Sequence, residues 1–377
     1  MASHSSLKNR DLSSGDMAQL AANAAGGPRP PQIPHSRPQF GRGERRAVLA
    51  TLDRAWAGAG GEASRELEHA LMALFRCPAA VAVASGSAAL EVALRVVGVA
   101  GELVAVPAFA CGSLERAIVR SGGRPYLVDA DPGDLSFPPG RLNSLAATCR
   151  AAIVVHQFGL PAASAAEAAD AAIPVIEDVT TCIGGRVMGR TVGGSGRLVV
   201  MSFSATKLVC GGEGGAILGS AEDVAAARRW IDPESDLPPD APVPHAKMPD
   251  LGCALARVQL ERLPEFLSRR AEIARRYDEA LGEQAHRVLR PPGDRTGTWW
   301  RYLIAAAGDA AGIVERGRAN GVCLSRPVPG RRWEGRGSFP VSDRLHRNLV
   351  SVPIYPSLRD SEIRHVRHTL AEVMGAR

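Results

Sequence analysis

Lysine is nearly absent from this chain. Lys and Arg together number 45, yet the only lysines are Lys8, Lys207 and Lys247. Arginine supplies positive charge, but its guanidinium stays protonated and cannot act as an amine nucleophile. A compositional preference for arginine explains the scarcity of lysine. It does not explain the position of Lys207 just before the glycine-rich segment Gly211–Gly215. Lys207 is therefore the first candidate for covalent chemistry.

Paired cysteines and long apolar runs are also missing. The seven cysteines are scattered, and no two are spaced as Cys-x-x-Cys. This pattern predicts reduced thiols in a cytoplasm and argues against disulfides or a zinc site. No apolar run reaches the roughly 18 residues of a membrane span, and the N-terminal residues lack the apolar core of a secretory signal. We therefore expect a cytoplasmic protein with no metal and no membrane partner.

Aromatic residues make up only 5% of the chain, although the net charge is +6. The arginines are spread along the sequence, so no basic surface with interleaved aromatic side chains is visible. We therefore expect no nucleic-acid partner. The positive charge is equally consistent with an anionic small-molecule substrate, such as a phosphate or a nucleotide-linked compound.

The chain does contain a regular alternation of short apolar runs and helical patterns. Residues 1–36 are rich in Ser, Ala, Gly and Pro, which predicts a disordered tail. The alternation that follows predicts an α/β fold, with a three-layer α/β/α domain over 37–245 built on a mostly parallel sheet. A small C-terminal α+β domain is predicted over 246–377. The predicted strands are 81–84, 103–106, 125–128, 152–156, 174–176 and 198–203, with a hairpin from the last one into 216–218.

Ligands of parallel sheets bind outside the carboxyl ends of the strands, so the residues that follow each strand are candidates for a site. Ser85-Gly86-Ser87 opens a helix, where free N–H groups could bind a phosphate, although plain N-capping explains the turn as well. Asp178 ends another strand. Its carboxylate could hold a cationic ring nitrogen, bind a metal, act as a base or pair with an arginine. His156 closes a third strand, where a histidine is more often structural than catalytic.

One cofactor requires several of these groups together. Pyridoxal phosphate (PLP) needs a lysine amine for its aldehyde, a carboxylate that keeps its ring nitrogen protonated, and N–H groups for its phosphate. Lys207, Asp178 and the Ser85-Gly86-Ser87 turn follow three different predicted strands. The rival for a parallel sheet, a NAD-binding unit, is disfavoured because no G-x-G-x-x-G follows the first strand.

With these motifs in place, the chain resembles the DegT/DnrJ/EryC1/StrS family of PLP-dependent sugar aminotransferases, within the aspartate-aminotransferase fold (fold type I). The resemblance extends from about Arg37 to the C-terminus. It rests on ordered motifs, namely Ser85–Leu90, Val128–Pro132, His156–Gly159, Ile176–Asp178, Ser202–Gly215, Met248–Leu263 and Leu349–Pro353.

The resemblance implies a role for each matching residue. Lys207 would bind the cofactor covalently and shuttle a proton, and Asp178 would pair with the pyridine nitrogen. The phosphate would be held by Gly86, Ser87 and Ser202.

The family also forms homodimers whose active sites borrow residues from the partner subunit. That arrangement would place His245 and Lys247 in the neighbouring site, His245 at the cofactor phosphate and Lys247 near the substrate.

Several positions depart from the family pattern. Cys111 stands where the family has a ring-stacking aromatic residue, and Phe109 is a candidate to cover the ring instead. Thr181 stands three residues after Asp178, where Gln or His is usual. The segment around Arg326 lacks the His-Tyr-Pro pattern. Together these departures suggest an unusual substrate. We take Arg326, together with His156, as a candidate substrate contact.

These features predict an aminotransferase that moves an amino group from glutamate or glutamine to a keto-sugar, keto-cyclitol or related intermediate of specialised or amino-sugar metabolism. A PLP enzyme with different chemistry, such as elimination, is the first alternative. A non-catalytic binding or regulatory protein on the same fold is the second.

Overall fold

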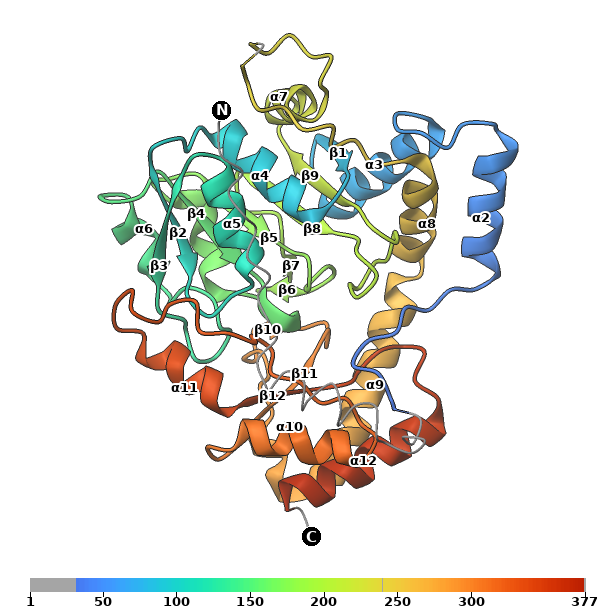
Figure 1. The fold of residues 1–377 in the computed structure, drawn as a ribbon, viewed down its shortest axis with the longest axis vertical. Helices are drawn as coiled ribbons and strands as arrows, with labels where there is room; N and C mark the ends of the chain where they lie inside the picture. Colours follow the sequence, from blue (N-terminus) through green and yellow to red (C-terminus); the bar gives the residue numbers. More distant parts are fainter. Residues whose placement is uncertain (1–31, 239, 376–377) are drawn as a thin grey trace, which may run out of the picture.

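A seven-stranded sheet forms the centre of the larger part of the molecule (Figure 1). The computed structural model describes residues 32–238 and 240–375. The strand order is β1-β9-β8-β5-β4-β2-β3. The strands are β1 (Ala79–Val83), β2 (Leu103–Pro107), β3 (Arg124–Val128), β4 (Ala151–Val155), β5 (Val175–Asp178), β8 (Leu198–Ser202) and β9 (Gly215–Gly219).

The sheet is mostly parallel, as the sequence predicts. Every pairing along β8-β5-β4-β2-β3 is parallel, and β9 is antiparallel to both of its neighbours. The predicted hairpin from β8 into β9 is also present. Gly214 in its connection has a φ of +135° and lies against Met248 so closely that a Cβ would collide with that side chain. This turn therefore requires glycine.

Helices cover both faces of the sheet, which confirms the three-layer architecture. Val81 and Val83 of β1 belong to a core that includes α4 (Gly86–Val97), α5 (Gly112–Arg120) and α7 (Ala221–Ile231). Ala80 and Ala82 of the same strand face the opposite core, which includes α3 (Glu62–Phe75) and α8 (Asp250–Glu261). The alternation follows from the two-residue repeat of a strand, which sends successive side chains to opposite faces.

Several shorter or peripheral elements complete this part of the chain. The segment after β4 contains a 3-10 helix, η2 (Ala163–Asp170). Helix α2 (Arg42–Asp53) packs against α8. The remaining elements are α6 (Arg141–Leu145), α11 (Pro340–Asn348), β6 (Arg186–Val187), β7 (Arg190–Thr191), β10 (Arg295–Thr296), η1 (Gln157–Gly159) and η3 (Gly282–Arg287).

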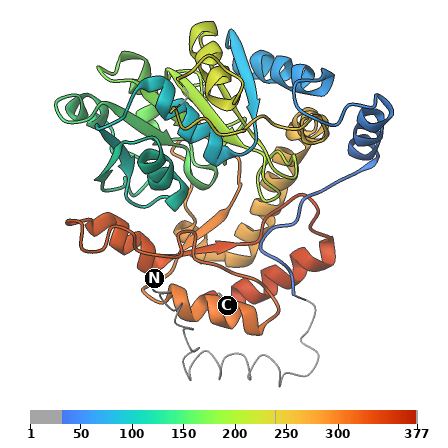
Figure 2. The same ribbon diagram turned by 45° about the horizontal axis from the view of Figure 1, so that its top comes forward.

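The C-terminal elements lie below the large sheet as Figure 2 draws it. Helices α9 (Leu263–Leu281), α10 (Ala310–Ala319) and α12 (Asp360–Met374) share a core with the antiparallel pair β11 (Tyr302–Ala305) and β12 (Leu349–Val352). Helix α8 packs instead with the core of the large sheet. The division of the chain into domains at 245/246 stays a prediction.

Residues 32–36 correct one expectation, because they were predicted to belong to a disordered tail. Ile33 is buried and pairs with Val322. His35 donates from Nδ1 to the carbonyl of Cys323 at 2.9 Å, and its Nε2 accepts from the hydroxyls of Ser325 and Ser351, both at 3.1 Å. These bonds use the neutral ring, with one nitrogen as donor and the other as acceptor. Residues 1–31 lie outside the described residues.

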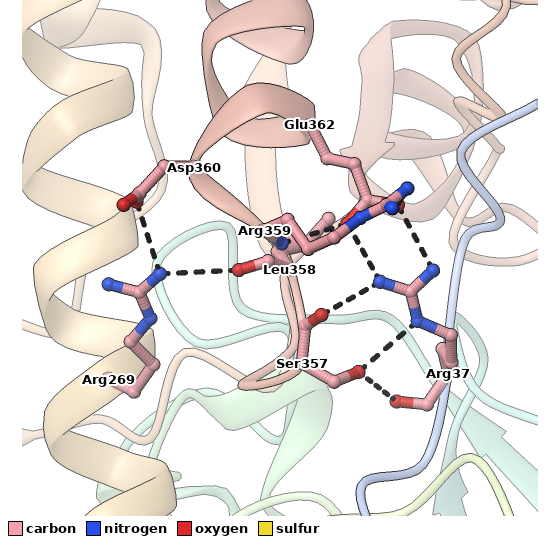
Figure 3. A network of polar contacts seen from close by, with 7 residues as sticks. All are labelled: Arg37, Arg269, Ser357, Leu358, Arg359, Asp360 and Glu362. Carbon is pink, nitrogen blue, oxygen red and sulfur yellow. Dashed lines mark hydrogen bonds and ion pairs between the residues drawn. The ribbon is translucent and has the colours of Figure 1, made fainter.

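The next residue, Arg37, ties this segment to the start of α12 (Figure 3). Its guanidinium donates to both carboxylate oxygens of Glu362 at 3.0 and 2.8 Å, and to the carbonyl of Ser357 at 2.7 Å. Glu362 also accepts from the backbone N–H of Arg359, which closes the first turn of the helix. A bidentate pair of this kind fixes orientation as well as distance, so the chain enters the fold at a defined place.

Acidification is expected to loosen this N-terminal attachment. Burial lowers the pKa of His35 to about 3, helped by Arg301 and opposed by the hydrogen bond to Cys323. The unfolded chain takes up a proton near its ordinary pKa of about 6.5, whereas the folded chain does so only near pH 3. The free energy of unfolding therefore falls as the pH drops through that window, by about 2 kcal/mol at pH 5. Urea unfolding at pH 7 and pH 5 checks this prediction. The free energy of unfolding of His35→Gln should fall by correspondingly less between the two pH values than that of the unmodified protein. An equal fall in both proteins contradicts the prediction.

Candidate active site

A cavity of about 700 Å³ lies at the carboxyl ends of the parallel strands. Asp178 at the end of β5, Ser202 at the end of β8 and Val155 at the end of β4 all line it, as a site of this fold requires. Lys207 lies on its wall, and segment 327–332 of the C-terminal part contributes as well. Five predicted site residues from distant parts of the chain thus share one cavity with Lys207 and Asp178: Gly86, Ser87, Cys111, Thr181 and Ser202.

The N-terminus of α4 forms one end of this cavity. The Ser85 hydroxyl accepts from the backbone N–H of Ala88 at 3.1 Å, so Ser85 is the N-cap. Gly86 lies against Ser202, and a Cβ at Gly86 would stand 2.5 Å from the Ser202 Cβ. The N–H groups of Gly86 and Ser87 belong to the first turn of the helix, which has no earlier carbonyls to bond. Ser85 therefore caps the helix, while the N–H groups of Gly86 and Ser87 remain available for an anion. This arrangement fits a phosphate.

Lys207 is partly buried, on the loop after β8. Burial lowers the pKa of its amine, and the negative charge of Asp178 partly opposes this effect. Its Nζ lies 5.0 Å from the centre of the Trp300 ring. The indole N–H of Trp300 in turn donates to the carbonyl of Thr206 at 3.0 Å, which connects the aromatic ring to the lysine loop. The cavity therefore holds an amine whose neutral, nucleophilic form is more accessible than in water.

Asp178 faces the cavity at the end of β5. Its Oδ1 accepts from the backbone N–H of Thr180 at 3.0 Å, which orients the carboxylate. Thr181 lines the same cavity, but its hydroxyl donates to the carbonyl of His156 at 2.7 Å. A threonine in this state offers a ligand its oxygen lone pairs rather than its proton.

His156 does not reach the cavity. Its ring is fully buried, accepts at Nδ1 from the N–H of Ala162, and bonds through Nε2 to Glu177 at 3.0 Å. Burial would raise the pKa of Glu177. The His156 bond and N–H groups, including those of Gly193 and Gly196, outweigh burial and hold that pKa below its usual range. The prediction of a substrate contact for His156 therefore fails, and the ring instead anchors a loop under the site.

Phe109 is also placed away from the cavity. Its side chain is fully buried between Phe158 and Trp333, at ring centroid distances of 6.3 and 6.0 Å. It cannot cover a ring bound beside Lys207, which corrects the expectation. Cys111 does line the cavity and is exposed to it.

Three further predicted residues lie outside this chain's cavity lining. His245 is exposed, and the ammonium of Lys247 pairs with Asp232 at 3.0 Å. Arg326 donates to the carbonyl of His346 at 2.7 Å, which directs its guanidinium into the C-terminal part and away from the cavity. The expected substrate contact of Arg326 is not supported.

Sequence reasoning missed Arg116 and Arg332, which both line the cavity. Arg332 lies against Gly112, and a Cβ at Gly112 would stand 3.0 Å from its guanidinium carbon. Its Nη2 also donates to the carbonyl of Ala110. Arg116 is exposed and forms no ion pair with any residue in 32–238 or 240–375. Because arginine is common in this chain, its occurrence at 116 and 332 carries no signal. The only sequence feature related to Arg332 is Gly112, whose missing side chain leaves room for that guanidinium.

The protein is a PLP-dependent aminotransferase of fold type I. This class is defined by the three-layer fold, by the partly buried amine of Lys207 near Asp178, and by the first turn of α4, which can bind a phosphate. The chain belongs to the DegT/DnrJ/EryC1/StrS aminotransferase family, whose model matches residues 38–371. Within the described residues, no helix is both long and apolar enough to span a membrane.

Solved structures of similar proteins agree with this assignment. The aminotransferase TlmJ of Streptoalloteichus hindustanus is 25% identical, with a TM-score of 0.80 over 91% of this chain and 99% of its own. The sugar aminotransferase CalS13 of Micromonospora echinospora is 26% identical, with a TM-score of 0.77 over 90% and 99%. A family member from Brucella abortus, 24% identical, has the same fold with a TM-score of 0.78 over 88% and 95%.

Proposed function

We propose that the protein transfers an amino group from glutamate or glutamine to a keto group on a sugar, a cyclitol or a related intermediate of specialised or amino-sugar metabolism. The observation that carries this proposal is the placement of Lys207, Asp178 and the first turn of α4 around one cavity. The family assignment and the similarity to CalS13, a sugar aminotransferase, support the sugar-like acceptor.

Each residue has a defined task in this proposal. Gly86, Ser87 and Ser202 would hold the phosphate through N–H and hydroxyl groups. Asp178 would hold a proton on the ring nitrogen of the cofactor, which when bound would supply an electron sink for carbanion chemistry. The Lys207 amine would hold the cofactor covalently, and its Nζ would carry a proton to and from the substrate carbon.

Two arginines in the cavity lining, Arg116 and Arg332, are available to bind the amino donor. Glutamate and glutamine both carry an α-carboxylate, and guanidinium groups bind carboxylates well. Arg116 has no ion-pair partner among the described residues, and Arg332 has only a distant one, Glu115, at 3.6 Å. We assign donor recognition to this pair.

The donor half-reaction tests the function and this recognition together. Glutamate added alone to the PLP-loaded protein should convert the cofactor from its aldehyde to its amine absorption spectrum and release one equivalent of 2-oxoglutarate. Arg332→Gln should raise the glutamate concentration needed for half-maximal conversion roughly tenfold or more, because a charge-assisted hydrogen bond is lost. Arg326→Gln is the matched control, because its guanidinium does not line the cavity. If neither glutamate nor glutamine converts the cofactor to the amine spectrum, transamination is contradicted and elimination is favoured instead.

We also propose that two copies share their sites in a cytoplasmic homodimer. His245 and Lys247 lie outside the lining of this chain's own cavity. If they contact cofactor or substrate, as the family pattern implies, they reach the site of a neighbouring copy.

A further inference from the structure

Trp300 joins the C-terminal part of the chain to the lysine loop, residues 203–214 between β8 and β9. It precedes β11 in the sequence, yet its side chain packs in the core of the large sheet, together with Leu208 and Val209 of the lysine loop. It is 7% exposed and lines the active-site cavity. The indole is therefore part of the wall of the active site, although it comes from the other part of the molecule.

The backbone around Trp300 is fixed against the turn that follows β4. The N–H of Arg301 donates to the carbonyl of Phe158 at 3.1 Å, and a Cβ at Gly159 would stand 2.7 Å from the backbone nitrogen of Trp300. Phe158 and Trp299 have φ values of +56° and +51°, in the left-handed region that large side chains rarely adopt. Such conformations persist only where the surrounding contacts impose them, and they concentrate at functional sites.

Two contacts connect this fixed indole to Lys207. The Nζ atom lies 5.0 Å from the ring centre, which is within the range of a cation–π interaction. The indole N–H donates at 3.0 Å to the carbonyl of Thr206, the residue before the lysine. Phe158 stacks on the same indole, with 6.1 Å between the ring centroids and 21° between the ring planes. One residue thus holds both the backbone from which Lys207 extends and the amine at its tip.

The charged groups around Lys207 act on its amine in opposite directions. Burial has the largest effect and lowers the pKa of the amine, and the positive charge of Arg301 adds to it. Asp178, Cys111 and Glu213 raise that pKa and so oppose burial. A carboxylate can also take the proton from an ammonium group, whereas an aromatic face attracts the ammonium through its quadrupole and leaves the proton in place. The indole is therefore suited to hold a protonated amine that must later give its proton to another atom.

We propose that Trp300 is a positioning residue for Lys207, which holds the lysine loop through its N–H and the protonated amine through its ring face. This role rests on the proposed task of Lys207, whose Nζ must keep a proton between two transfers and remain close to the substrate carbon. Trp300 itself exchanges no proton with the substrate. It acts through the lysine, by limiting where the amine can go.

Fluorination of the Trp300 ring tests the contact with the amine, because fluorine weakens the negative face of the ring with little change of shape. Increasingly fluorinated tryptophans are placed at position 300 of the full chain. The pKa of Lys207 is then measured in the cofactor-free protein by competitive acetylation across a pH range and peptide mapping, which a chain with only three lysines makes simple. This pKa should fall stepwise along the series, by about 0.5 to 1.5 in total. A pKa that stays constant along the series overturns the proposal. The measurement involves no catalysed reaction, so its failure is distinct from a failure of the proposed function.

Trp299 provides the matched control for the fluorinated series. It is the neighbour of Trp300 in the chain, but its ring stacks on Tyr302 at 5.7 Å and lies beneath Arg290, outside the lining of the active-site cavity. The same fluorinated residues at position 299 should leave the pKa of Lys207 unchanged. An equal fall at both positions contradicts a specific contact between Trp300 and the amine.

Trp300→Phe tests the bond to the lysine loop, because it keeps an aromatic ring and removes the N–H that donates to Thr206. The maximal rate of cofactor conversion by glutamate should fall roughly three- to tenfold, as expected for a lost hydrogen bond. The glutamate concentration needed for half-maximal conversion should stay the same, because the lysine and not the donor site is disturbed. A higher half-maximal concentration at an unchanged maximal rate would assign Trp300 to donor binding and contradict the positioning role.

Discussion

Lys207→Gln is expected to abolish covalent cofactor binding and to lower the turnover of the amino-transfer reaction by about 10³-fold or more. The glutamine amide cannot attack an aldehyde, and it cannot carry a proton at the position of Nζ. Reduction with borohydride followed by peptide mapping gives a clear result, because the chain has only two other lysines, Lys8 and Lys247. A pyridoxyl adduct should appear on Lys207 in the unmodified protein and on no lysine in the variant.

Lys247→Gln is the matched control for this mapping. It makes the same substitution at a lysine paired with Asp232 outside this chain's cavity lining, so the adduct on Lys207 should persist. An adduct on Lys247 in the unmodified protein, or none on Lys207, would remove the basis of the proposed function.

Asp178→Asn is expected to lower turnover by roughly 10- to 1,000-fold while cofactor binding survives. A neighbouring carboxylate raises the pKa of a cationic nitrogen by roughly one to three units, so its loss reduces the protonated fraction of the ring by the same factor at a fixed pH. Asparagine keeps the shape and can still accept from the N–H of Thr180, so the loop should remain in place.

The pH profile distinguishes this role from a structural one. Because the ring nitrogen of Asp178→Asn protonates only at lower pH, the activity that remains should rise as the solution becomes more acidic. Asp178→Glu restores the charge and should recover part of the rate. An Asn variant within about threefold of the unmodified rate, with an unchanged profile, would refute the assignment.

Much of the fold could be predicted from the pattern of apolar runs. The seven strands of the large sheet match the predicted runs to within a few residues, and their mostly parallel pairing follows from alternation with helices. The prediction failed where the sequence is polar and short of periodic signals. Residues 32–36 were assigned to a tail because they end the segment 1–36, which is rich in Ser, Ala, Gly and Pro. They are held by hydrogen bonds of His35 with Cys323, Ser325 and Ser351, which lie 288 to 316 positions away.

The candidate site could also be predicted only in part. Lys207, Asp178 and the turn at Gly86 could be predicted because each follows a strand whose end the apolar pattern of the sequence indicates. His156 has the same kind of sequence position and still lies outside the cavity, because Glu177 and the N–H of Ala162 use both ring nitrogens. Strand position alone does not tell which way a side chain turns or which neighbour occupies it.

The sequence by itself determined the fold class, the family and the three groups that we propose bind the cofactor, because local periodicity and short motifs carry that information. The near absence of lysine made Lys207 conspicuous, and its position after β8 made it a candidate. Only the tertiary structure decided that Phe109 is buried, that Arg332 occupies the space left open by Gly112, and that Trp300 contacts the lysine loop. These last facts depend on contacts between segments far apart in the chain, which no local pattern specifies.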